Sequence, residues 1–286
     1  MNTFKNLHPL TLFCYFFCVL FISVFSFNPA YLAVGFIGAV LYGARLNGIA
    51  QALKSMFGYF LIILIVTVTN PLFSHNGATA LFFINDNRVT LEALIYGAVT
   101  GLAIAEALIW FSCFNRTFDS EKLLYIFGRI SPKTALVVSM ALSFIPRFVK
   151  TFHSVNESQK SLPVSRVRRF ICSFSAVITQ SMEGAIITSD SMKARGYNQG
   201  KRTFYSRFVF TVYDGAYLTA AVLFAVLSLV SVVSGSVGFK FYPYFVMPEL
   251  SVSAALGFCA FSLLALMPFV FEIKEDIKWK YSVSII

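Results

Sequence analysis

Long runs of apolar residues dominate both ends of the chain. Four lie before residue 115, at 10–27, 29–43, 56–70 and 91–114, and two lie after residue 207, at 208–233 and 251–271. A membrane-spanning helix needs about 20 mostly apolar residues, so the pattern predicts six spans, with five as the nearest alternative. The second and third runs are short, and we expect each to recruit neutral flanking residues or to tilt. The first run is expected to be retained as a span, because no small-residue cleavage site follows it.

The middle of the chain shows a different pattern, in which apolar side chains recur every three or four residues. This period predicts long amphipathic helices rather than spans over 131–154 and 166–196. Ser131 and Pro132 are suited to begin the first helix, and Pro146 should bend it. The expected apolar faces comprise Val137, Ala141, Phe144, Phe148 and Phe152 in the first helix, and Phe170, Phe174, Val177, Ser181, Ala185, Thr188 and Met192 in the second.

Composition agrees with a membrane protein. Hydrophobic residues make up 57% of the 286 residues and charged residues only 13%, which is too apolar for an ordinary soluble domain. We therefore expect an all-α polytopic membrane protein with three parts: a four-span membrane domain at 1–114, a cytoplasmic helical domain at 115–207, and a two-span hairpin with a cytoplasmic tail at 208–286.

The basic residues predict the orientation. If the N-terminus is cytoplasmic, 21 of the 23 Lys and Arg residues fall on the inner side, and only Arg88 and Lys240 fall outside. Basic residues prefer the cytoplasmic side, so both termini are expected there. The whole net charge of +10 resides in residues 115–207. It fits the orientation signal with lipid headgroup contacts, or a docking surface for a partner with an acidic groove. Nucleic-acid binding is not expected, because no known motif accompanies the charge.

Arg195 is the most informative single cation. It follows Met192 by three residues on the same predicted helix face, and Gly196 is suited to end the helix in a left-handed turn. One interpretation is that Arg195 only complements the dipole of the helix end. The other is that its planar guanidinium, beside the adaptable side chain of Met192, fills a pocket of a partner.

The sequence lacks the common motifs for phosphate binding, metal binding and catalysis. The stretch from Gly196 to Lys201 has three residues between its glycines where a phosphate loop needs four, and it follows a helix. The three histidines and five cysteines form no cluster with ligand spacing. No nucleophile, base and acid come together, so we expect no catalytic residue, no metal site and no directly bound cofactor. No inverted repeat of the transporter type is visible either.

A few polar positions fall inside or beside the predicted spans. Glu106 is expected to face protein, because a carboxylate facing lipid is costly. Glu92 should lie in the first turn of its helix. Asp214 is expected near the basic segment. Gly97 and Gly101 permit close helix packing.

With these residues in view, the sequence resembles the transmembrane T component of energy-coupling factor transporters, the family that includes the cobalt-uptake subunit. The resemblance extends over nearly the whole chain, and its strongest part is the SMKARGY stretch at 191–197. The other matching stretches are Arg202-Thr203, Asp214, His8-Pro9-Leu10, Asn70 to Gly77, Thr90 to Ala93 with Tyr96-Gly97, and Phe144 to Arg147.

The resemblance implies a bacterial or archaeal membrane protein that holds two cytoplasmic ABC ATPases through long coupling helices. The same helices would grip a small membrane S component, which delivers a vitamin, cobalt or another metal ion. ATP would be used by the partner ATPases. It implies that Met192, Ala194, Arg195 and Gly196 dock one ATPase, with Arg202 and Asp214 in support. It also implies that Phe144, Phe148, Phe170 and Phe174 pack the coupling helices and the S component.

The chain departs from the family pattern at the end of the earlier coupling helix. The family usually carries a second Ala-Arg-Gly triplet at the end of the earlier coupling helix, where this chain has Glu157 to Leu162. Only Lys160 offers a cation there, without the bidentate fork of arginine. Two other functions stay open: a substrate-conducting permease of an ordinary ABC importer, and a membrane enzyme, which lacks a visible catalytic constellation.

Overall fold

The computed structural model describes residues 4–74, 77, 79–84, 87–163, 165–197, 199–200, 208–235, 238–239, 241–242 and 251–284. The chain divides into two compact units, one formed by Met1–Asp119 with Phe208–Ile286 and the other by Ser120–Arg207. Each unit is described by itself.

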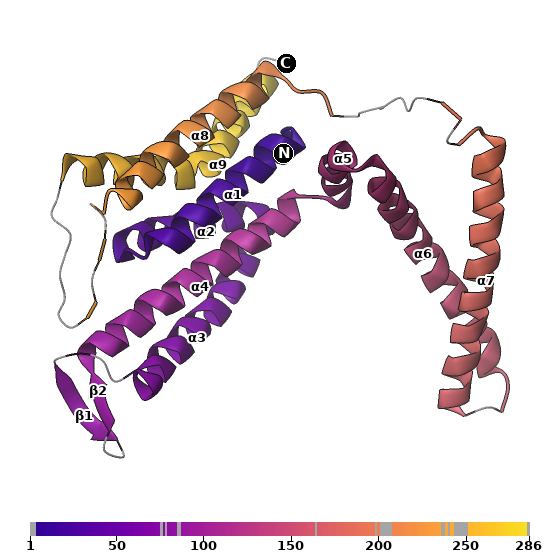
Figure 1. Cartoon of the computed structure of the whole chain (residues 1–286), viewed down its shortest axis with the longest axis horizontal. Helices are drawn as coiled ribbons and strands as arrows, with labels where there is room; N and C mark the ends of the chain where they lie inside the picture. Colours follow the sequence, from indigo (N-terminus) through magenta and orange to yellow (C-terminus); the bar gives the residue numbers. More distant parts are fainter. Residues whose placement is uncertain are drawn as a thin grey trace. The chain divides into compact units, whose positions relative to one another are not determined.

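The first unit is a helical bundle (Figure 1). Its elements are a short 3-10 turn, Phe4–Asn6, then α1 (Pro9–Ser26), α2 (Pro29–Asn47), α3 (Ile49–Phe73), β1 (Ala80–Ile84), β2 (Asn87–Thr90), α4 (Leu91–Thr117), α8 (Val212–Val233) and α9 (Val252–Ser284). All six predicted spans are helices. The two short predicted runs, 29–43 and 56–70, become the longer helices α2 and α3, because both helices include flanking residues outside the apolar run.

The second unit contains α5 (Ser120–Ile130), α6 (Pro132–Lys160) and α7 (Arg166–Ala194). The two long amphipathic helices are confirmed, and Ser131 and Pro132 begin α6 as predicted. Pro146 lies inside α6. The sequence analysis did not anticipate α5, whose 11 residues are too few to stand out beside the long runs.

A two-stranded antiparallel hairpin between α3 and α4 was not predicted. Phe83 pairs with Arg88 and Ile84 with Asn87. The strands have five and four residues, so their period-2 signal is weak beside the flanking helical runs. The hairpin leaves the fold class unchanged.

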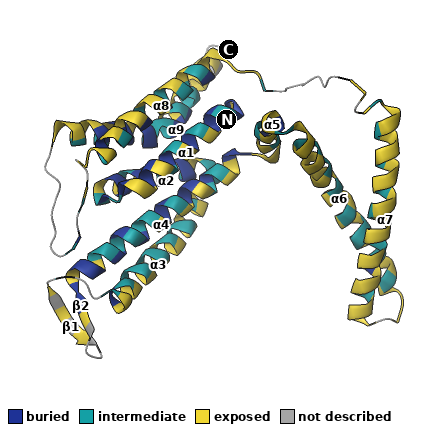
Figure 2. Ribbon diagram, viewed as in Figure 1, coloured by how far each residue is buried: buried dark blue, intermediate teal, exposed yellow. Residues whose placement is uncertain are grey.

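Eight described helices are long and apolar enough to cross a membrane. They include α6 and α7 besides the six predicted spans. The helices differ in burial (Figure 2): half of the apolar window of α1 is buried, against 6% for α3, 6% for α7 and none for α6, so burial alone does not set α6 and α7 apart from the six predicted spans. Length and composition therefore support a multi-pass membrane protein, with the span count approximate.

Aromatic side chains fill the centre of the bundle. Phe4 packs edge-to-face against Tyr15 and Tyr42, with ring centroids 5.4 and 5.6 Å apart, and Trp110 is fully buried beside them. The hydroxyl of Tyr15 donates to the Leu264 carbonyl at 3.1 Å, so the cluster also links α1 to α9 by a hydrogen bond. Such packing and interhelical hydrogen bonds hold helices together where lipid removes the hydrophobic drive.

Glycines bring α3 and α4 into backbone contact, as the spacing of Gly97 and Gly101 predicted. A Cβ at Gly97 would lie 3.1 Å from the Thr67 Cα, and one at Gly101 would lie 3.0 Å from the Ile63 Cα. These distances are tighter than nine in ten real Cβ contacts, so a larger residue at either position would require α3 to shift.

Candidate docking site on α6 and α7

The end of α7 is closed by a Schellman turn. Gly196 has φ +78°, its N–H donates to the Lys193 carbonyl at 2.9 Å, and the Tyr197 N–H donates to the Met192 carbonyl at 3.0 Å. This pair of bonds satisfies the last helical carbonyls and requires a left-handed residue, which glycine supplies without strain. The predicted role of Gly196 as the residue that ends the helix is confirmed.

Arg195 is the C-cap of α7, with φ −81° and ψ 8°. Its backbone N–H donates to the Ser191 carbonyl at 3.1 Å, while its side chain is exposed. The ion pairs of the described residues include none with Arg195. The turn therefore fixes the backbone and leaves the Arg195 guanidinium exposed, without an ion pair among the described residues.

The neighbours of Arg195 are arranged unequally. Met192 is half-buried and Ala194 is exposed at the last helical position. The Nζ of Lys193 lies 3.8 Å from Oδ1 of Asp190, so this carboxylate partly neutralises the charge of Lys193. Arg202 lies outside the described residues. Arg195 is thus the cation at this end of α7 that the described acids leave unpaired.

Lys160 occupies the corresponding place on α6, since it is the last helical residue. Its ammonium donates to Glu157 Oε1 at 2.5 Å. This hydrogen bond and the charge of Lys160 lower the pKa of the Glu157 carboxyl. The C-cap Ser161 has φ −74° and ψ −8°, so α6 ends without the left-handed glycine that closes α7. The two helix ends therefore differ in backbone as well as in charge.

The four phenylalanines lie along the α6–α7 pair. Phe144 and Phe148 are half-buried and line a cavity of about 140 Å³ together with Arg147, Thr151, Gln180, Ser181, Gly184 and Thr188. Phe170 contacts Phe152 of α6, with ring centroids 5.7 Å apart, and stacks on Phe174. Phe170 and Phe174 are otherwise exposed. The pair thus has an inner polar and aromatic seam and an open apolar surface.

Asp214 joins two helix starts in the first unit. Its carboxylate accepts hydrogen bonds from the Thr211 hydroxyl at 2.6 Å and the His8 N–H at 2.8 Å. Thr211 and Asp214 form a capping box at the start of α8, and His8 is the N-cap of α1. The sequence analysis placed Asp214 near the basic segment. Residues 201–207 of that segment lie outside the described residues, and among the described ones the Asp214 carboxylate ties α8 to α1.

Two more of the resembling stretches meet where α3 and α4 join the hairpin. The Asn70 side chain donates to the Ala93 carbonyl at 2.7 Å. Glu92 is buried in the first turn of α4, as predicted, and accepts a hydrogen bond from the Thr79 hydroxyl at 2.8 Å. These hydrogen bonds hold the connection between α3 and α4, so the structure gives these residues a role in the fold.

Glu106 faces protein, as predicted, and its side chain is fully buried. A Cβ at Gly35 of α2 would come within 1.9 Å of its Oε1, so the glycine provides the space that the carboxylate occupies. The nearest polar groups are Ser23 and Trp110, and neither carboxylate oxygen makes a well-formed hydrogen bond among the described residues. The sequence analysis did not identify Gly35 as the counterpart of Glu106.

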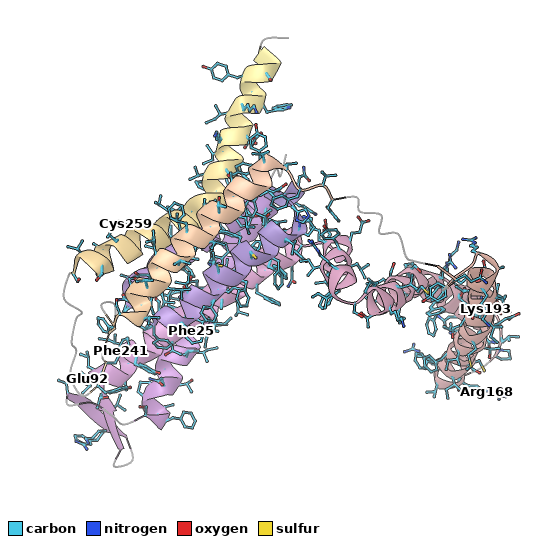
Figure 3. All side chains as sticks on the ribbon, turned by 45° about the horizontal axis from the view of Figure 1, so that its top comes forward. Phe25, Glu92, Arg168, Lys193, Phe241 and Cys259 are labelled. Carbon is cyan, nitrogen blue, oxygen red and sulfur yellow. The ribbon has the colours of Figure 1, made fainter. Side chains whose placement is uncertain are left out.

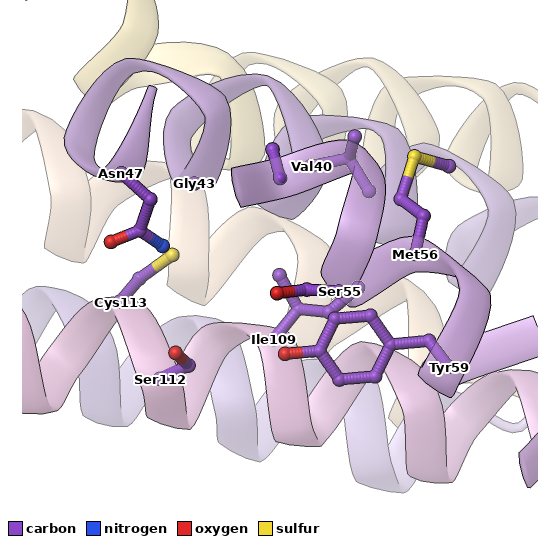
Figure 4. Close-up of a pocket in the computed structure, with 10 residues that line it drawn as sticks. Val40, Gly43, Asn47, Ser55, Met56, Tyr59, Ile109, Ser112 and Cys113 are labelled. Carbon is purple, nitrogen blue, oxygen red and sulfur yellow. The ribbon is translucent and has the colours of Figure 1, made fainter. Parts of the chain in front are cut away.

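A second cavity lies where α2, α3 and α4 meet (Figure 4). Asn47, Ser55, Tyr59, Ser112 and Cys113 contribute its polar lining, and its volume is about 30 Å³. That is room for one or two water molecules, whereas small-molecule sites measure about 300–1,000 Å³. Neither this cavity nor the one between α6 and α7 is large enough for a vitamin.

Comparison with known proteins assigns the chain to a family. No curated protein matches the chain significantly. The profile of the family described as cobalt transport protein matches residues 3–206, more than two thirds of the chain. The matched region contains both long helices and Arg195, and it ends before Asp214. The chain therefore belongs to the cobalt transport protein family, which is the family of energy-coupling factor T components.

Proposed function

We propose that this protein is the scaffold and coupling subunit of an energy-coupling factor importer. It docks two cytoplasmic ABC ATPases and passes their ATP-driven motion to a membrane S component that binds the vitamin or metal ion. The observation that carries this proposal is Arg195, an exposed and unpaired guanidinium held by the Schellman turn of α7 within the family match.

Purification from the native membrane in mild detergent tests this proposal. We expect the chain to bring two ATPases and a separate small membrane protein with it. ATPases without a small membrane protein would favour a substrate-conducting permease instead. Recovery of the folded chain without any ATPase would reject the proposed function.

The membrane placement of α6 and α7 follows from charge. If both helices crossed the bilayer, the segment that joins them would carry Lys160, Arg166, Arg168 and Arg169 to the side opposite the other bases. Basic residues avoid the outer side, so we infer that both helices lie along the cytoplasmic face. Both termini are then cytoplasmic as well.

Cysteine labelling provides a topology prediction. Single cysteines replacing Ser154 and Gln199, in a variant without the five native cysteines, should be unreactive toward an impermeant maleimide added to intact cells. They should react once the membrane is opened, because both positions are exposed on the protein. Labelling of Ser154→Cys from outside would show that α6 crosses the membrane.

The unequal helix ends lead to a second prediction. Lys160→Ala should weaken ATPase retention less than Arg195→Ala does, because Lys160 is paired with Glu157 and lacks a bidentate fork. Retention of each ATPase by the two variants, purified side by side, is the measurement. Equal losses, or a greater loss for Lys160→Ala, would contradict the inferred asymmetry.

A further inference from the structure

One ionisable side chain of the first unit lies far from both ends of its helix. Glu106 follows Leu91, the first residue of α4, by 15 positions and precedes Thr117, the last residue, by 11. At about 1.5 Å per residue, the two helix ends are roughly 22 and 16 Å away. The Glu106 side chain is fully buried. It therefore lies in the part of a span where a charged group is most costly.

The Glu106 carboxyl is enclosed by three helices. A Cβ at Gly35 of α2 would lie 1.9 Å from its Oε1 and 3.2 Å from its Oε2, so both oxygens lie against the α2 backbone. The polar side chains beside it are Ser23 of α1 and Trp110 of α4, both buried. Among the described residues, neither carboxyl oxygen has a well-formed hydrogen bond, and the Trp110 Nε1 has none either. The three helices thus bring an acid, a hydroxyl and an indole N–H together in a space that depends on glycine at position 35.

The three helices place no positive charge near this carboxyl. The sequence of α1 contains no Lys or Arg. The cation of α2 is Arg45, ten residues after Gly35, and that of α4 is Arg116, ten residues after Glu106. Ten helical residues correspond to about 15 Å. The ion pairs found among the described residues do not include Glu106.

The other titratable side chains of these helices do not supply a positive charge either. Those that are buried, apart from Glu92 at the start of α4, are Tyr15, Tyr31, Tyr42 and Cys113. Phenols and thiols carry no positive charge in either protonation state. None of the four is among the groups that act on Glu106.

Every other buried carboxyl in the described part of the chain is compensated. Glu92 lies at the start of α4 (Figure 3) and accepts a hydrogen bond from a threonine hydroxyl at 2.8 Å. Asp214 accepts from a hydroxyl at 2.6 Å and from a backbone N–H at 2.8 Å. Glu272 lies 4.0 Å from the Arg45 Nε. Glu106 differs from all three, because it has no well-formed hydrogen bond, helix N-terminus or cation beside it.

We propose that Glu106 is held as the neutral carboxylic acid, and that this proton keeps α2 packed against α1 and α4. An uncompensated buried anion is far more costly than a buried neutral acid. The neutral acid offers an O–H donor and a carbonyl acceptor, which are complementary to the Ser23 hydroxyl and the Trp110 N–H. The proton can leave only when water reaches the carboxyl, and this requires α2 to move away at Gly35. Proton binding and closure of the three helices are therefore linked, whichever partners the chain binds.

Infrared spectroscopy of the full-length chain in lipid nanodiscs at neutral pH tests the protonation state. The wild type should show the C=O stretch of a protonated carboxylic acid, and Glu106→Gln should lose this band. Glu183→Gln is the matched control, because Glu183 is an exposed glutamate of α7 and its replacement should leave the band unchanged. Heat unfolding of the wild type should replace the acid band by carboxylate bands, which tests the assignment without any variant.

The pH dependence of stability tests the link to helix packing. Unfolding exposes Glu106 to water, where the carboxyl ionises, so above mildly acidic pH the unfolded chain binds fewer protons than the folded one. Stability should therefore fall as the pH rises, and the wild type should lose thermal stability relative to Glu106→Gln, which cannot ionise. Two results would overturn the inference. One is a wild-type spectrum without an acid band, or with one that Glu106→Gln retains. The other is a stability difference between the two chains that does not change with pH.

Discussion

Arg195→Ala should produce a chain that folds and reaches the membrane but no longer holds its second ATPase. The substitution leaves the Schellman turn intact, because that turn depends on Gly196 and on backbone bonds. It removes the guanidinium, and under the proposed docking it would leave an acidic group of the ATPase buried without a counter-ion, which costs about 2–5 kcal/mol. At about 1.4 kcal/mol per tenfold, ATPase binding should weaken by roughly thirtyfold or more, and uptake should be lost.

Arg195→Lys separates docking from helix capping. Lysine also complements the dipole at a helix C-terminus, so the variant should match the wild type if capping is the only role. If the guanidinium is bound by a partner, the loss of its planar fork should weaken docking to a level between wild type and Arg195→Ala. ATPase affinity of the three purified chains decides this. Wild-type affinity and uptake in correctly inserted Arg195→Ala would leave Arg195 as a helix cap.

Much of the helical fold could be predicted, because each long helix carries a strong local signal. Apolar runs specified the six helices of the first unit, and a 3.6-residue period specified α6 and α7. The start of α6 and the end of α7 were also readable, since Pro132 and Gly196 act through backbone geometry alone, whereas α6 runs to Lys160, six residues beyond the predicted 154. The sequence left α5 and the hairpin unassigned, because short elements are stabilised mainly by their neighbours.

The candidate site was only partly predictable, because local spacing identifies some of its residues but not their side-chain contacts. Arg195 was identified from its spacing to Met192 and Gly196. The pairing of Lys160 with Glu157 depends on side-chain positions, and so does the tie between Asp214 and His8, which are 206 residues apart.

The α3–α4 contact provides the second large effect, and here the expected failure is of folding. In the double variant Gly97→Leu/Gly101→Leu, each new Cβ alone would stand 3.0–3.1 Å from α3 backbone atoms. Backbone cannot rotate away as a side chain can, so α3 must move. Overpacking costs about 1–3 kcal/mol per site, and two sites together consume a large part of a total stability of about 5–15 kcal/mol.

Displacement of α3 would also break the hydrogen bond from Asn70 to the Ala93 carbonyl, which adds to the cost. We therefore expect the double variant to lose its sharp thermal transition in detergent and to co-purify with neither ATPases nor the S component, unlike Arg195→Ala. Gly58→Leu is the matched control, because no atom lies within 4 Å of a Cβ at that position of α3. A double variant as stable as this control would show that α3 and α4 do not require their close approach.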